Sequence, residues 1–232
     1  MSTSAAITVV LLVLVVVNVW VHLGPRVAHS FTGPLAAGLL LLVGRAAGLS
    51  WDELGLGREA LARGLWWGAV SAGFVAIVYG IGVAVPAARR YFRDTRYRVG
   101  AGSAVYMAFV AIPLGTVIFE EVAFRSVLFG LLEVEYGAAA ATIVSSLLFG
   151  LWHVLPALDL TRTNTELSGN VGDRRRVWLT VLGTVAFTIV GGLVFAVLRW
   201  QTGSLLGPVL LHWATNGLGV LAAARVWAIS RR

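Results

Sequence analysis

Long apolar runs separated by short polar segments dominate the chain. A helix needs about 20 mostly apolar residues to cross a hydrocarbon core about 30 Å thick. Runs of this length recur along the whole sequence, and no polar segment between them is long enough for a second domain. We therefore expect an all-α bundle of about seven to eight transmembrane helices, forming one domain over residues 1–232. The expected spans are residues 5–23, 33–49, 65–86, 102–134, 138–155, 177–199 and 204–229.

The fourth run, residues 102–134, is too long for one straight crossing and contains Pro113. Proline removes a backbone donor and clashes with the preceding turn, so it kinks or ends a helix. We therefore expect a kink at Pro113, or an end of this helix that leaves the membrane.

Composition agrees with lipid as the solvent. The chain is 58% hydrophobic and 12% charged, against roughly 25% charged residues in soluble domains. Cysteine is absent, which excludes disulfides, thiolate metal sites and a cysteine nucleophile. All 18 basic residues are arginine and the net charge is +7. Because these arginines flank apolar runs, we expect them to face anionic lipid headgroups, with no nucleic-acid partner.

The arginines also predict an orientation. On the seven-span reading, twelve lie in the loops after spans one, three and five and in the C-terminal tail, against four on the opposite side. The positive-inside rule then places the N-terminus outside and the C-terminus in the cytoplasm. Arginine without lysine, with abundant Ala, Gly and Val, suggests a GC-rich genome. We therefore expect a bacterial cytoplasmic (plasma) membrane.

Three polar motifs interrupt the apolar runs. An ionised side chain at the bilayer centre costs about 2.5–3.5 kcal/mol on insertion scales, so such residues need a partner or a purpose and normally face the bundle interior or a wet cavity. The polar residues are Glu120, Glu121 and Arg125 in the fourth run, His153 at the end of the fifth, and His212 and Asn216 in the seventh.

Helical spacing distinguishes the two glutamates. Glu121 and Arg125 are four positions apart, so they share a face and can pair within the helix. Glu120 points about 100° away and lacks that partner. Glu120 is therefore the carboxylate left free to act as a general base on water.

The other two motifs use the same spacing. His212 and Asn216 project together, and an imidazole and a carboxamide so placed can donate hydrogen bonds to a developing oxyanion. Phe149 and His153 also share a face, so the phenyl ring is expected beside the imidazole. These groups, meeting with Glu120 in one cavity, would form a site able to hydrolyse a peptide bond without a covalent nucleophile.

Each motif alone also has a structural explanation. A buried histidine is more often structural than catalytic, Glu121–Arg125 is an ordinary ion pair, and Asn216 can bridge two helices. Three such motifs in three separate spans favour a shared site.

Together the motifs resemble the CAAX-prenyl-endopeptidase and bacteriocin-processing (CPBP, or Abi) family of intramembrane proteases. Its signature is E-E-x-x-x-R, then F-x-x-x-H, then H-x-x-x-N, and the chain has all three in order within residues 100–222. The resemblance implies that Glu120 and His153 activate the attacking water and that His212 and Asn216 stabilise the oxyanion. It also implies that Glu121 and Arg125 hold the geometry of the first helix.

The resemblance leaves the metal question open. Members of the family were long described as metalloproteases, and Glu120 with His153 and His212 is a reasonable zinc set. The H-E-x-x-H pair of zinc peptidases is absent. We favour direct activation of water without a cofactor, with zinc as the alternative.

The predicted function is an endopeptidase that cleaves membrane-associated substrates, of CAAX-like or bacteriocin-like type. Its expected partners are a peptide or lipidated protein substrate in the membrane and the lipid bilayer itself. One alternative is a non-catalytic bacteriocin-immunity or scaffold protein. A second, a small transporter with Glu120 as its proton site, is disfavoured because the sequence has no inverted repeats.

One difficulty concerns depth in the membrane. His153 is expected near the cytoplasmic end of its span, whereas His212 lies only eight residues into span seven from the other side. At about 1.5 Å per residue, straight helices would hold the imidazoles more than about 10 Å apart. Either span seven starts deep in the bundle, around residues 203–208, or span five ends deep.

Overall fold

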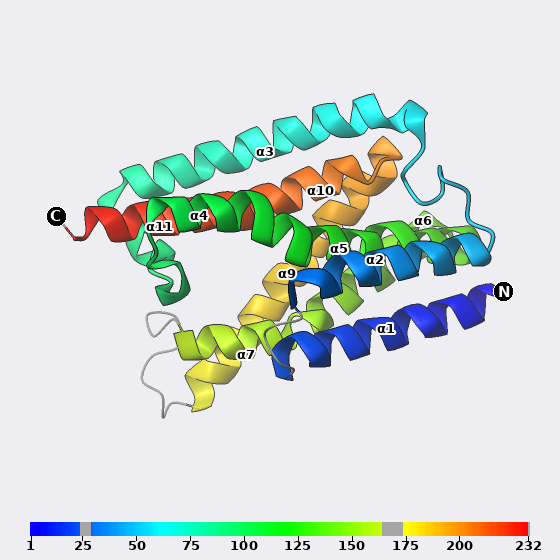
Figure 1. Ribbon diagram of the computed structural model, residues 1–232, viewed down its shortest axis with the longest axis horizontal. Helices are drawn as coiled ribbons and strands as arrows, with labels where there is room; N and C mark the ends of the chain where they lie inside the picture. Colours follow the sequence, from blue (N-terminus) through cyan, green and yellow to red (C-terminus); the bar gives the residue numbers. More distant parts are fainter. Residues whose placement is uncertain (24–28, 164–173, 232) are drawn as a thin grey trace.

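The structure, a computed structural model, describes residues 1–23, 29–163 and 174–231, and over these ranges the chain is helical and contains no strand (Figure 1). Five helical segments in this described part are long and apolar enough to cross a membrane, and α2 adds a shorter apolar helix. The all-α, polytopic membrane fold is confirmed. The helices outside the centre are α1 (Thr3–Leu23), α2 (His29–Ala46), α3 (Leu61–Ala84), α9 (Arg174–Thr202), α10 (Leu206–Trp213) and α11 (Gly219–Ile229).

The fourth apolar run continues as one helix through Pro113. This proline begins a π-helical segment and does not end the helix. The chain instead reverses at Gly137, whose φ of 83° is a left-handed value that favours glycine. The reversal falls between residues 134 and 138, where one span was expected to end and the next to begin. The helix consists of α4 (Ala101–Tyr106), η5 (Met107–Ala111), η6 (Pro113–Val117), α5 (Ile118–Glu121), η7 (Val122–Leu128) and the first part of α6 (Phe129–Trp152).

Shorter helices complete the bundle. α6 ends at Trp152, and α7 (Val154–Thr163) follows it directly. The polar connections contain 3-10 turns, and the π-helical segment η8 joins α10 to α11. These elements are η2 (Arg58–Ala60), η3 (Pro86–Phe92), η4 (Thr95–Tyr97) and η8 (Ala214–Leu218).

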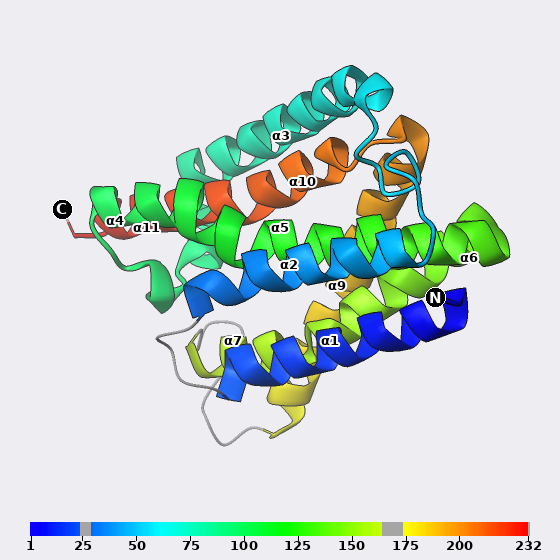
Figure 2. The same ribbon diagram turned by 45° about the vertical axis from the view of Figure 1, so that its right-hand side comes forward.

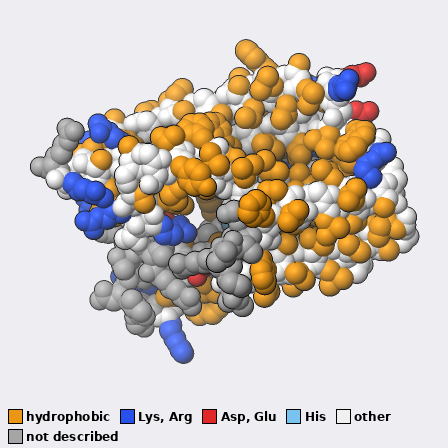
Figure 3. Space-filling view, viewed as in Figure 1, with side chains coloured by type: hydrophobic (Ala, Val, Ile, Leu, Met, Phe, Trp, Pro, Cys, Tyr) orange, Lys and Arg blue, Asp and Glu red, His pale blue; other side chains and the backbone are white. Residues whose placement is uncertain are grey.

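The helix with the two glutamates lies at the centre of the molecule. Residues 119–132 are buried without interruption, and α1, α2 and α9 pack around this stretch and α6 (Figures 1 and 2). The outer surface is largely apolar, and arginine side chains gather mainly at the end where the C-terminus lies (Figure 3). Glu120 and Glu121 therefore face protein and not lipid.

The expected difference in depth between His153 and His212 is absent from the structure, because their Nε2 atoms lie 3.9 and 3.8 Å from the same Glu120 oxygen. α10 follows α9 after a short turn. Gly203 makes this turn with a φ of 66°, and Leu205 N donates to Gly55 O at 2.8 Å in the loop after α2. The two imidazoles are therefore level with each other, and α7 continues the chain beyond His153.

Candidate active site

Glu121 and Arg125 form the ion pair that their spacing predicts. Arg125 Nη1 donates to Glu121 Oε1 at 3.1 Å, and both side chains are fully buried. The guanidinium carbon lies 3.9 Å from the ring centroid of Phe149 and 5.0 Å from that of Phe195. The Arg125 charge is therefore balanced by one carboxylate and by aromatic faces.

Glu120 is held differently. Its Oε1 accepts a hydrogen bond from Trp152 Nε1 at 3.0 Å. Its Oε2 is buried without a hydrogen-bond partner, 3.9 Å from His153 Nε2 and 3.8 Å from His212 Nε2. These separations are too long for hydrogen bonds. One carboxylate oxygen is anchored, and the other faces two imidazoles.

The hydrogen bonds of His153 fix its tautomer. Its Nδ1 lies 2.7 Å from Phe149 O, and a carbonyl only accepts, so Nδ1 carries the proton. The Nε2 lone pair of neutral His153 then points toward Glu120. The Phe149 ring packs edge-on against the imidazole with centroids 4.5 Å apart, as the shared helical face predicts.

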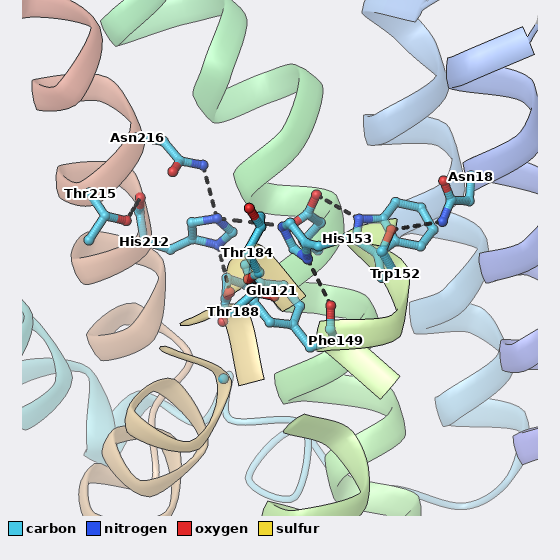
Figure 4. A network of polar contacts seen from close by, with 12 residues as sticks. Asn18, Glu121, Phe149, Trp152, His153, Thr184, Thr188, His212, Thr215 and Asn216 are labelled. Atoms are coloured by element: carbon cyan, nitrogen blue, oxygen red, sulfur yellow. Dashed lines mark hydrogen bonds and ion pairs between the residues drawn. The ribbon is translucent and has the colours of Figure 1, made fainter. Parts of the chain in front are cut away.

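His212 is oriented by both of its neighbours in the motifs. Its Nδ1 donates to Glu121 Oε1 at 2.8 Å, and Asn216 Nδ2 lies 3.1 Å from its Nε2 (Figure 4). Phe195 stacks on the ring, with centroids 5.1 Å apart. With Nδ1 as the donor to Glu121, the Nε2 of His212 is the acceptor for the Asn216 amide N–H. The structure thus brings together all six residues singled out by the sequence.

A cavity of about 670 Å³ reaches the site. Glu120, His153 and Asn216 line its inner part, and residues of η3 and η4 line it near the arginine-rich end. The cavity therefore connects the buried carboxylate with one end of the bundle. Its other lining residues include Val17, Val21 and His22 of α1, Gly33 of α2, and Gly115, Thr116 and Phe119 of the central helix.

The site was also tested for a metal ion. Among the described side chains, no group of three or more His, Asp or Glu residues is placed to hold one. The zinc set expected as an alternative, Glu120 with His153 and His212, is not such a group in this geometry.

Two residues that contact the site were missed from the sequence. The indole N–H of Trp152 donates a hydrogen bond to Glu120, and Asn18 Nδ2 donates one to Trp152 O at 3.0 Å. Trp152 lies inside the second motif, but only Phe149 and His153 of that motif were interpreted from the sequence. Asn18 carried a signal, since it is an amide within an apolar span, but sequence alone does not reveal its partner.

Comparison with known families decides the classification. The family model described as Type II CAAX prenyl endopeptidase Rce1-like matches residues 102–218, half of the chain. The chain belongs to this Rce1-like family. Neither a curated protein nor a solved structure matches the chain. The resemblance to CPBP proteases is thereby confirmed.

The Rce1-like match covers every motif residue of the site, from Glu120 to Asn216. It assigns the protein to a family of CAAX-type intramembrane proteases, in agreement with the apolar helices of the fold. Asn18 lies outside the Rce1-like segment.

Proposed function

We propose that the protein is an intramembrane endopeptidase in which Glu120 and His153 activate the attacking water. The observation that carries this proposal is the position of Glu120 Oε2, which is buried, has no hydrogen-bond partner and lies 3.8–3.9 Å from two imidazole nitrogens. A single water molecule can contact all three groups. One of its hydrogens would be donated to Glu120 and the other to the His153 Nε2 lone pair.

In the proposed reaction, Glu120 and His153 remove a proton from this water as its oxygen attacks the peptide carbonyl carbon. The carbonyl π electrons move to oxygen and form a tetrahedral oxyanion. When the C–N bond breaks, the abstracted proton passes to the leaving nitrogen. The products are a carboxylic acid and an amine, so no covalent enzyme intermediate is formed.

The oxyanion would be stabilised from the α10–η8 side. In the structure the Asn216 amide N–H faces His212 Nε2; in the reaction both groups would turn to the oxyanion, Asn216 donating its amide N–H and His212 donating from Nε2 once that nitrogen takes up a proton. Glu121 orients the His212 ring by accepting from Nδ1, and Arg125 balances the charge of that carboxylate. The motif residues thus divide into a water-activating pair, an oxyanion-binding pair and a supporting ion pair.

We further propose that the substrate is a lipidated, CAAX-like protein and that the arginine-rich end of the bundle faces the cytoplasm, with the N-terminus outside. The cavity runs from that end to Glu120, so a cytoplasmic peptide tail could reach the site while its lipid stays in the bilayer. Cleavage without a bound metal is part of the proposal and predicts full activity after thorough chelation.

The test is cleavage of a farnesylated CAAX peptide by the purified protein in liposomes containing H₂¹⁸O. Mass spectrometry should find removal of the last three residues and one ¹⁸O in the new carboxylate. An intact probe at all protein concentrations would contradict the proposal and would favour the non-catalytic immunity or scaffold alternative. Loss of activity on chelation, restored by zinc, would contradict the metal-independent mechanism.

A further inference from the structure

The carbonyl of Trp152 lies at a break in the backbone hydrogen bonds between α6 and α7. In a continuing helix it would accept from the N–H four residues ahead. That residue is Pro156, which has no N–H. Helical bonding resumes at the next carbonyl, because Ala157 N donates to His153 O at 2.9 Å.

Asn18 supplies the missing donor from another helix. Its Nδ2 donates to the Trp152 carbonyl at 3.0 Å from α1 (Figure 4). The span that contains Asn18 is strongly apolar, with a mean hydropathy of 2.6. A half-buried amide in such a helix costs free energy unless it is hydrogen-bonded. The contact therefore gives a partner to the amide nitrogen of Asn18, whose Oδ1 is buried without one, and to the carbonyl that Pro156 leaves without a helical donor.

Trp152 in turn sets the direction of the candidate general base. Its indole N–H holds Oε1 of Glu120 at 3.0 Å, which leaves Oε2 facing the two imidazoles. The indole is 8% exposed and packs against Phe119 and Phe124 at centroid distances of 5.7 and 6.0 Å. Because the indole is rigid and has a single donor, a movement of the end of α6 changes where the Glu120 carboxylate points.

We propose that Asn18 is a positioning residue for the site. The Asn18 amide donates a hydrogen bond to the Trp152 carbonyl and so fixes the end of α6. The indole of Trp152, which donates to Glu120, is thereby oriented. The inference rests on the proposed peptidase function. Asn18 lies outside residues 102–218, so it extends the functional unit to the first helix of the chain.

Asn18→Leu removes the amide donor with little change in volume. With the farnesylated CAAX probe in liposomes, kcat should fall about five- to twentyfold while KM changes less than about twofold, as expected for loss of one hydrogen bond that orients a base. Thr8→Val is the matched control in the same helix. The Thr8 hydroxyl bonds only its own helix, at Ser4 O, so both constants should stay at the wild-type values.

A second substitution tests the mechanism of the effect. Pro156→Ala restores a backbone N–H at the position that can reach the Trp152 carbonyl within its own helix. Asn18→Leu combined with Pro156→Ala should therefore regain most of the lost kcat. The kcat of the double variant is compared with that of Pro156→Ala alone, because Pro156 lines the cavity and its replacement can itself change the rate. A purely structural role of Asn18 predicts no such recovery.

The indole of Trp152 provides a readout that needs no turnover. Its ¹H–¹⁵N resonance in micelles, assigned through Trp152→Phe, should move in Asn18→Leu and in Glu120→Gln. An unmoved resonance in Asn18→Leu, with or without loss of rate, overturns the inference, and so does a rate loss that Pro156→Ala fails to recover. If the native protein cleaves nothing, the proposed function fails, yet the resonance still decides the role of Asn18. Asn18→Ser, too short to reach the carbonyl, replaces Asn18→Leu if that variant does not fold.

Discussion

Removing Arg125 should destabilise the protein more than any single exposed change, because it leaves a buried carboxylate without its cation. Arg125 and Glu121 are both fully buried and 3.1 Å apart. Deleting one partner of a buried pair costs about 3–5 kcal/mol, whereas replacing both partners by neutral groups is often neutral. Arg125→Met should therefore lose about 3–5 kcal/mol of unfolding free energy, even though the methionine keeps much of the contact with the Phe149 ring.

The double variant Glu121→Gln/Arg125→Met separates charge from packing. The glutamine amide oxygen still accepts from His212 Nδ1, and no uncompensated charge remains. The double variant should have an unfolding free energy at least about 2 kcal/mol higher than that of Arg125→Met. Reversible unfolding by SDS in mixed micelles, followed by the fluorescence of the nine tryptophans, measures both values. A loss below about 1 kcal/mol in Arg125→Met, or no recovery in the double variant, would refute the reasoning.

Smaller changes test the packing, the loop and the cavity. Gly33→Ala should cost about 1–3 kcal/mol in the same SDS assay, because its Cβ would lie 2.9 Å from two backbone carbonyls, whereas Gly38→Ala, with nothing within 4 Å, should cost nothing. Hydrogen bonds from the side chain and backbone of Ser50 lower the pKa of Glu53 below its ordinary 4.5, so the stabilisation is present above that value and lost as pH falls through the folded pKa. Ser50→Ala should make the loss of stability at low pH smaller. A stability–pH profile unchanged by Ser50→Ala would contradict a role of the Ser50–Glu53 hydrogen bonds. Thr116 lines the cavity, and the chain has no cysteine of its own. The variant Thr116→Cys should therefore react with a membrane-impermeant thiol reagent, whereas Gly38→Cys, on the outward face, should not. Equal labelling of the two variants would contradict a water-filled cavity.

Much of the fold could be predicted because lipid imposes simple rules. A membrane span must be long, apolar and internally hydrogen-bonded, so the apolar runs locate the helices to within a few residues. The reversal at Gly137 falls at the expected boundary between the fourth and fifth runs. The effect of Pro113 was less predictable, because π-helical turns can absorb a proline without ending the helix.

The site was predictable within each helix and not between helices. Four-residue spacing fixes which side chains share a face, and it gave the Glu121–Arg125 and His212–Asn216 pairs. The donor to Glu120 could not be read this way, because Trp152 reaches it from another helix. The meeting of His153 and His212 beside one Glu120 oxygen could not be read either, because it depends on how three helices pack. Tertiary contacts of this kind leave no periodic signal in the sequence.

The most direct test of the water-activation mechanism is the single-turnover rate of Glu120→Gln on the farnesylated CAAX probe in liposomes. Glutamine keeps the acceptor for the Trp152 indole but cannot take a proton from water, so the rate should fall by about 10²–10⁴-fold with the protein still folded. Glu135→Gln, on the exposed part of α6, should cleave at the native rate. Cleavage by Glu120→Gln at the native rate would contradict the mechanism.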